Sequence, residues 1–228
     1  THIVSLELVA HMFVNGAIDD VRLSDSALYS SNFSPSCFNL RALFSTTGVW
    51  NFDNTSFQNI AIDSSNNQNN GIINGAIKSV EDICKVTTVA NCLELDGVND
   101  HIDLGSTIAS GARTIEMWFK PSNTINSNLS VHKGLIAREN AIGTNVNEFN
   151  LSFIPSGISS NLAGKLRFTI HNSFNTPMPI YSNSNIWNSS QWYHVAAVIH
   201  PSQGMSLFID GIRQISTHSN SQAISVSN

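Results

Sequence analysis

Hydrophobic and polar residues alternate along several segments of the chain. The alternation has a period of two in residues 114–120, 148–153, 165–171 and 205–210. Successive side chains of a β-strand point to opposite faces of the sheet, so a period of two predicts strands with one buried face. The pattern therefore indicates antiparallel sheets that each cover the core with one face.

Residues 192–200 are more continuously apolar and predict a strand that is covered on both faces. The pair Asp210-Gly211 separates two apolar runs, and this dipeptide is a strong signal for the tight turn of a β-hairpin. Many short strands without a long helical period predict an all-β fold. The expected architecture is a jelly-roll sandwich of two antiparallel sheets.

Polar stretches separate the predicted strands. Residues 63–71 and 121–130 are rich in Asn and Ser and predict loops. One helical turn is expected over residues 24–30, where Ser24 or Asp25 would cap it.

The composition narrows the class of protein. The chain has 228 residues, of which 41% are hydrophobic and 12% are charged. A chain of this length and hydrophobic fraction can bury a large core. Its low charged fraction is unlike that of a charge-rich disordered chain. The net charge of −5, with 11 Lys and Arg residues, argues against nucleic-acid binding because no basic stripe can neutralise phosphates. No window approaches the ~18 apolar residues of a membrane-spanning helix.

Five segments carry a resemblance to a known family. They read GVWNFD (residues 48–53, with the loop at 63–71 after it), LELDGVNDHI (93–102), TIEMWFKP (114–121), QWYHVA (191–196, preceded by Trp187) and LFIDG (207–211). In this order they resemble the strand motifs of a bacterial laminin-G-like domain of the concanavalin A-like lectin/glucanase superfamily. The resemblance implies a jelly roll with a binding role.

One motif of this family stands out of order. Residues 15–28 (NGAIDDVRLSDSAL) resemble the closing strand, which normally comes last. We divide the chain into residues 1–31, a closing-strand motif that belongs to a preceding repeat or completes this jelly roll, a linker at 32–47, and a laminin-G-like domain at 48–228. A jelly roll that lacks one strand exposes unpaired backbone groups. We therefore expect residues 17–23 to pair in a sheet of the main domain or of a neighbouring copy.

Candidate catalytic groups are sparse. Retaining glycoside hydrolysis needs two carboxyl groups ~5–5.5 Å apart, and laminarinase-type members of the superfamily cluster carboxylates two residues apart on one strand. Here Glu116 and Glu148 stand alone on their strands, and Asp100 and Asp103 flank a turn. We expect no catalysis. His194 lies in the predicted covered strand, and we interpret it as a core histidine rather than a base or a metal ligand.

A structural calcium ion is implied by the family resemblance. In the family this ion joins the loop corresponding to residues 63–71 to the Asp of the closing motif. Ca²⁺ takes 6–8 oxygen ligands from carboxylates, amides and backbone carbonyls. The implied ligands are Asp63, Asn67 or Asn69, and Asn70, with Asp19. The alternative interpretation is a solvated polar turn without an ion.

The aromatic residues divide into two groups. Trp50, Trp118 and Trp192 fall on strand motifs, and we expect them in the core. Trp187 and Tyr181 lie between Asn- and Ser-rich runs, so they are the candidate ligand-binding residues. For both, the alternative is a loop cap over the edge of the sandwich.

The three cysteines allow one disulfide. Cys84 and Cys92 bracket a short segment that is compatible with a hairpin, and we predict a bond between them. Cys37 is then left over.

These observations predict a non-catalytic module for recognition or adhesion. We expect it to be extracellular, to bind glycan or a cell-surface protein, and to be stabilised by calcium. One alternative is a structural subunit of a surface fibre, in which the N-terminal strand completes a neighbouring copy. A further alternative is a cryptic glycoside hydrolase or lyase.

Overall fold

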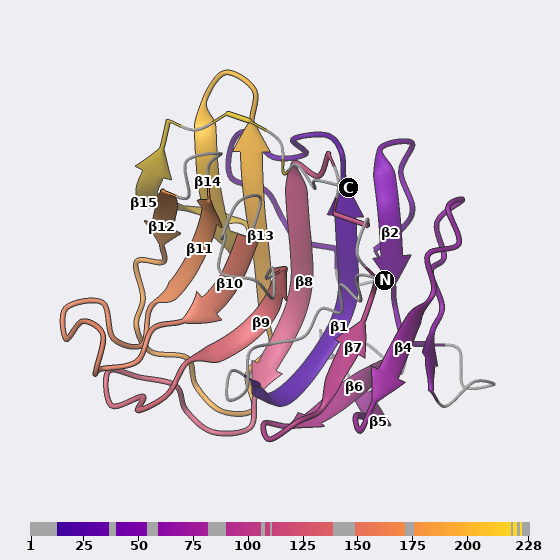
Figure 1. Ribbon diagram of the computed structural model, residues 1–228, viewed down its shortest axis with the longest axis horizontal. Coiled ribbons are helices and arrows are strands. Elements are labelled where there is room, and N and C mark those ends of the chain that lie inside the picture. Colours follow the sequence, from indigo (N-terminus) through magenta and orange to yellow (C-terminus); the bar gives the residue numbers. More distant parts are fainter. Residues whose placement is uncertain are drawn as a thin grey trace.

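The computed structural model describes residues 13–36, 40–53, 59–81, 90–105, 108–109, 111–138, 149–171, 176–219, 221–222 and 224. Every regular element among these residues is a β-strand, and the paired strands are antiparallel (Figure 1). No helix in this part of the chain is long and apolar enough to cross a bilayer. The predicted all-β jelly-roll architecture is confirmed.

The strands form three sheets. In spatial order, the large sheet contains β15 (Ile212–His218), β14 (Gly204–Ile209), β13 (Tyr193–His200), β8 (Thr114–Pro121), β1 (Asn15–Ser24), β6 (Ala90–Asp96) and β5 (Ile77–Glu81), with β2 (Thr46–Trp50) also paired to β1. The four-stranded sheet contains β12 (Pro177–Tyr181), β11 (Leu166–His171), β10 (Phe149–Phe153) and β9 (Lys133–Arg138). A small sheet contains β3 (Ile60–Ala61), β4 (Gly71–Asn74) and β7 (His101–Asp103).

The core lies between the large sheet and the four-stranded sheet. Phe119 of β8 packs against Phe153 of β10, with ring centroids 5.5 Å apart. Trp187 lies against both rings. Each strand turns its apolar set of alternate residues toward this core, as a period of two requires. The strands predicted from that period correspond to β8, β10, β11 and β14, so these predictions are confirmed.

The motif that stands out of family order forms β1, and β1 lies inside the large sheet. It pairs with β8 on one side; on the other side its first half pairs with β6 and its second half with β2. Its apolar residues Ile18, Val21 and Leu23 are buried in the main core. Residues 17–23 therefore pair within the chain's own sheet, where they close the gap between β8 and β6 (Figure 1).

Residues 25–36, which we call the strap, follow β1 and cross the outer face of the large sheet. Tyr29 and Phe33 of the strap stack with ring centroids 3.6 Å apart. Both rings pack on Phe208 of β14, beside Ala196 and Val198 of β13. The strap therefore gives the large sheet a second, smaller apolar cluster on the side away from the core.

The helical turn expected over residues 24–30 is wrong. This segment bonds to the sheet rather than to itself, because the N–H of Leu28 donates to Thr114 Oγ1 (3.1 Å). A few residues on, the N–H of Phe33 donates to the carbonyl of Gly211 (3.0 Å). A chain whose donors are used in this way cannot close helical hydrogen bonds.

The hairpin and covered-strand predictions are confirmed. Asp210 and Gly211 join β14 to β15 with φ angles of 49° and 75°. Positive φ at both central residues is what a type I′ turn requires. All residues of β13 except His200 are buried, so this strand is covered on both faces.

Candidate functional site

The loop at residues 63–71 uses its one carboxylate to hold its own shape. Asp63 Oδ1 accepts the backbone N–H groups of Val49 (2.9 Å) and Ser65 (2.8 Å). Asp63 Oδ2 accepts the hydroxyl of Ser65 (2.7 Å) and the N–H of Asn69 (2.8 Å). Four donors thus occupy the lone pairs that Ca²⁺ would use. In this conformation Asp63 does not fit the ligand role that the family resemblance implied.

The asparagines of this loop attach it to its neighbours. Asn67 Nδ2 donates to the carbonyls of Thr46 (3.2 Å) and Thr47 (3.1 Å), and Asn69 Nδ2 donates to that of Thr47 (2.9 Å). Asn70 Oδ1 accepts the N–H of Asp63 (2.9 Å). These bonds join the loop to the start of β2, which is the arrangement of a well-ordered polar turn.

Asp19, the remaining implied calcium ligand, lies among other carboxylates. Asp19 and Asp20 are each 1% exposed, and β1 bulges between Asp19 and Arg22. Burial, helped by the negative charge of Asp20, raises the pKa of Asp19 to about 9. Burial likewise raises the pKa of Asp20 to about 7, and the charge of Asp53 adds to both rises. A cation would relieve this repulsion.

The geometry of these carboxylates limits what they can bind. No group of three or more His, Cys, Asp or Glu side chains is placed to hold a metal within the described ranges. One oxygen of Asp19 already accepts the N–H of Asp20 (2.7 Å), and one oxygen of Asp20 accepts that of Leu40 (3.1 Å). A calcium ion here would need backbone oxygens or water to complete its shell.

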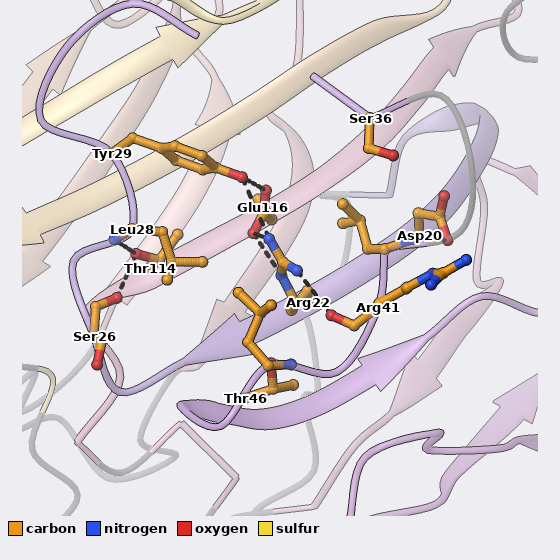
Figure 2. A network of polar contacts seen from close by, with 12 residues as sticks. Asp20, Arg22, Ser26, Leu28, Tyr29, Ser36, Arg41, Thr46, Thr114 and Glu116 are labelled. Carbon is orange, nitrogen blue, oxygen red and sulfur yellow. Dashed lines mark hydrogen bonds and ion pairs between the residues drawn. The ribbon is translucent and has the colours of Figure 1, made fainter. Parts of the chain in front are cut away.

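Glu116 of β8 is the centre of a buried polar network (Figure 2). Its side chain is 0% exposed and forms an ion pair with Arg22 of β1, whose Nε donates to Glu116 Oε1 (2.7 Å). Glu116 Oε2 accepts the hydroxyl of Tyr29 (2.8 Å) and lies 3.4 Å from His194 Nε2. Arg22 also donates to the carbonyl of Arg41 (2.9 Å). The network therefore links β1, β8, β13 and the strap.

The environment of Glu116 gives it a structural role. Burial alone would raise the pKa of Glu116, but contact with His194 and the charge of Arg22 outweigh it, and the pKa lies below its usual value. An ionised carboxylate that no solvent reaches cannot serve as a general acid on a substrate. The sequence showed Glu116 alone among carboxylates, but not its partners Arg22 and Tyr29, which lie 94 and 87 residues away in the chain.

Two of the tryptophans do not lie where the sequence placed them. Trp187 is 1% exposed, and its indole N–H donates to the carbonyl of Gly164 (2.9 Å). It has no free face for a sugar, so its prediction as a ligand-binding residue is corrected: it fills the core. Trp192 is only half-buried, with Lys120 Nζ 5.5 Å from its ring centre, so it is not the core residue we expected. Trp50 is buried as expected.

The predicted disulfide partner Cys84 and the third cysteine, Cys37, lie outside the described residues. Cys92 is buried in β6, opposite Ser79 of β5. The bond between Cys84 and Cys92 stays a prediction.

Tyr181 stands on a row of polar side chains that crosses the outer face of the four-stranded sheet. We call this surface the β10–β12 face and define it by Asn150, Ser152, Arg167, Thr169 and Tyr181. Cross-strand pairing sets Ser152 opposite Arg167 and Arg167 opposite Tyr181, while Asn150 lies opposite Thr169. The residues between them, such as Leu151 and Phe168, point into the core, so the polar set shares the other face.

The polar atoms of the β10–β12 face are enclosed, and several are not satisfied. Ser152 is 0% and Thr169 4% exposed, whereas Arg167 and Tyr181 are half-buried. Ser152 Oγ, Thr169 Oγ1 and Arg167 Nε have no hydrogen-bond partner in the part of the chain that the structure describes. Most buried polar groups in proteins are paired with protein or with water, so these three atoms stand out from the other polar atoms of the face. The period-two pattern located these residues on one face, but their cross-strand register was not visible in the sequence.

Comparison with known proteins agrees with the fold. A laminin G family model, described as the concanavalin A-like lectin/glucanases superfamily, matches residues 96–228. Neither the curated proteins nor the solved structures gave a match. The matched residues cover more than half of the chain, from β7 to β15, and include the whole β10–β12 face. The chain therefore belongs to the concanavalin A-like lectin/glucanases superfamily, as a laminin-G-like domain of the carbohydrate- or protein-binding type.

Proposed function

We propose that this domain is a non-catalytic, extracellular recognition module that binds glycan on the β10–β12 face. The observation that carries the proposal is the cluster of enclosed hydroxyl and guanidinium groups without partners at Ser152, Thr169 and Arg167. A sugar presents many hydroxyl groups that both donate and accept, and these groups match such a surface. Tyr181 borders the cluster and supplies an aromatic side chain with a polar end.

The absence of catalysis is part of the proposal. Glu116 is ion-paired with Arg22, and one carboxylate oxygen each of Asp19 and Asp20 accepts a backbone N–H, from Asp20 and Leu40 respectively. Hydrolysis needs carboxyl groups that are free to flank a bound substrate, and these three are engaged within the domain. A buried, ion-paired carboxylate supports a role in stability.

The arrangement of β1 favours this proposal over a fibre built by strand donation. A donated strand must leave its own domain, yet β1 pairs with β8, β6 and β2 of its own chain. Ile18 and Leu23 are also buried in the chain's own core. Donation would break both sets of contacts before any new contact formed.

Glycan binding is tested with the pair Thr169→Val and Thr217→Val. Both changes replace a hydroxyl with a methyl group, but Thr169 lies on the β10–β12 face and Thr217 is exposed on β15. On a glycan array, we expect the wild type and Thr217→Val to retain the same sugars and Thr169→Val to lose at least tenfold in affinity. Because Thr169 Oγ1 has no partner, the melting temperature of Thr169→Val should not fall. The proposal is contradicted if the two variants retain the same sugars equally well. It is also contradicted if neither the wild type nor either variant retains any sugar.

We also propose that the domain binds calcium at Asp19 and Asp20 rather than in the loop at residues 63–71. An ion that binds only the folded state stabilises it by mass action. A chelator should therefore lower the melting temperature of the wild type by several degrees. The effect should vanish in Asp19→Asn and persist in Asp63→Asn. If the effect of the chelator vanishes in Asp63→Asn instead, the ion lies in the loop at residues 63–71. If the chelator leaves the melting temperature of the wild type unchanged, calcium binding is contradicted.

A further inference from the structure

A hollow of about 280 Å³ lies on the outer face of the large sheet, over the first residues of β1. Cross-strand pairing sets Ala17 of β1 between Lys120 of β8 and Glu94 of β6, and Ile77 of β5 lies beyond Glu94. Ile18, the next residue of β1, belongs to the main core, so Ala17 and its paired neighbours point outward. A methyl group between two long side chains leaves the space above it unfilled. We call this feature the Ala17 hollow.

The rim of the Ala17 hollow is exposed to solvent and carries more negative than positive charge. Ile77, Glu94 and Asp96 line the hollow and are exposed. Asp100 also lines it, and its Oδ2 accepts the backbone N–H of Asp96 (2.9 Å). Lys120 stands on the opposite side of the hollow from Glu94. The hollow therefore suits an apolar side chain that has a positive charge beside it.

Side chains of this kind project from residues 41–46, which we call the Phe44 turn. Phe44 is fully exposed, and Leu43 is 47% exposed. Arg41, a few residues before Phe44, is exposed as well. A single exposed apolar residue is ordinary, but here an aromatic ring, a leucine and a guanidinium stand together on one turn. Aromatic and Arg side chains are the usual anchors of protein interfaces.

Hydrogen bonds hold the backbone of the Phe44 turn in place. The N–H of Leu43 donates to Thr46 Oγ1 (2.8 Å), and the N–H of Thr46 donates to the carbonyl of Leu43 (3.0 Å). The carbonyl of Arg41 accepts a hydrogen bond from Arg22 Nη1 (2.9 Å; Figure 2). A side chain on a fixed backbone loses less conformational freedom when it binds. The turn is therefore preorganised to insert Phe44 into a partner.

The Phe44 turn and the Ala17 hollow lie at opposite ends of β1. Ala17 is near the start of this strand, whereas Ser24, its last residue, pairs with Thr46 of the turn. An extended strand from residue 17 to residue 24 spans roughly 20 Å. Phe44 therefore cannot reach the hollow of its own chain, and the occupant has to come from another molecule.

We propose that copies of this domain associate head to tail, with Phe44 of one copy seated in the Ala17 hollow of the next. Arg41 then lies beside Glu94 and Asp96, which supply the opposite charge. The contact joins two different surfaces, so a bound copy still offers a turn or a hollow, and association continues into a chain or a ring. It differs from strand donation because β1 stays in its own sheet, and it is independent of glycan binding on the β10–β12 face. One turn forms a small interface, so the association is weak and reversible.

Sedimentation velocity of the full chain, from micromolar to millimolar concentration, detects this contact. We expect the weight-average sedimentation coefficient of the wild type to rise with concentration. Phe44→Ala and Glu94→Lys should each stay monomeric over the same range. Both should keep the melting temperature of the wild type, because both side chains are exposed. Ile215→Ala is the matched control: Ile215 is an exposed apolar side chain on β15, and its loss should leave the association unchanged.

Two further measurements test the direction of the contact. A mixture of Phe44→Ala with Glu94→Lys should give one-to-one dimers and nothing larger, because the first variant keeps an intact hollow and the second keeps an intact turn. The double variant Arg41→Glu with Glu94→Lys should recover part of the association that Glu94→Lys loses. The proposal is overturned if the wild type stays monomeric at every concentration, or if its association survives in Phe44→Ala. It is also overturned if Ile215→Ala abolishes the association as Phe44→Ala does, or if the mixture stays monomeric.

Discussion

At the scale of single residues, the charged side chains of Glu116 and Arg167 have different surroundings. Glu116 is enclosed with a full set of partners, so its charge holds strands together. Arg167 is half-buried, and its Nε has no hydrogen-bond partner among the described residues. Removing a charge should therefore lower the stability of the domain at Glu116 and leave it unchanged at Arg167.

Glu116→Gln should destabilise the domain by about 3–5 kcal/mol, the usual cost of breaking a buried ion pair from one side. The change leaves the Arg22 guanidinium buried without its counter-charge. Urea unfolding monitored by tryptophan fluorescence measures the loss. The double variant Glu116→Leu with Arg22→Met should recover part of it, because neither charge then remains. A loss below about 1 kcal/mol for Glu116→Gln would contradict the structural role.

The same carboxylate predicts a pH dependence. The pKa of Glu116 is lower in the folded state than its ordinary value, so its contribution is present above the pKa of the unfolded chain. That contribution is lost as the pH falls through the folded-state pKa. The melting temperature of the wild type should therefore drop more steeply below about pH 4.5 than that of Glu116→Gln. Parallel curves for the two proteins would contradict this assignment.

At the scale of elements, the strap connects β1 to the outer face of the large sheet. It begins where β1 ends and packs Tyr29 and Phe33 on the outer face of β13 and β14. It also delivers the hydroxyl of Tyr29 to Glu116 (2.8 Å). The strap therefore covers the buried network and keeps water from it.

Phe33→Ala should cost about 2 kcal/mol, since it removes apolar burial and the stacked ring pair with Tyr29. Phe44→Ala is the matched control, because Phe44 is fully exposed in the same connection between β1 and β2. Chemical unfolding of both variants gives the comparison. If Phe33→Ala is as stable as Phe44→Ala, the strap contributes nothing to the large sheet.

The sequence predicted the elements whose signals are local. Alternation located β8, β10, β11 and β14, and Asp210-Gly211 located the β14–β15 hairpin, because side-chain direction and turn geometry depend on neighbouring residues. The conformation of the strap was not predicted, because its hydrogen bonds go to Thr114 and Gly211, which lie far away in the sequence. The burial of Trp187 and the partial exposure of Trp192 were not predicted for the same reason: which ring enters the core depends on contacts that the local pattern does not encode.

At the scale of the whole molecule, the large sheet is continuous only because β1 is part of it. The family model begins at residue 96, yet β1 lies between β8 and β6 in the middle of the large sheet. The closing motif and its displaced position were visible in the sequence. Its pairing partners were not, because they are set by the register of strands about a hundred residues apart.

Deletion of residues 1–30 should give an unfolded or insoluble product, because it opens the large sheet at its centre and removes Arg22 from the buried network. Circular dichroism and size-exclusion chromatography detect the loss. A synthetic peptide of residues 13–36, added during refolding, should restore soluble protein. A deletion product that stays monomeric with an unchanged melting temperature would show that β1 is not part of this fold.

An NMR titration tests most directly whether glycan binds on the β10–β12 face. A sugar retained on the array is added to the isotope-labelled domain while backbone amide signals are followed. We predict that the largest shifts fall on Ser152, Arg167, Thr169 and Tyr181, and that they saturate together with one affinity. Shifts confined to the loop at residues 63–71 or to the edge strand β5, with those four signals unmoved, would contradict binding on the β10–β12 face.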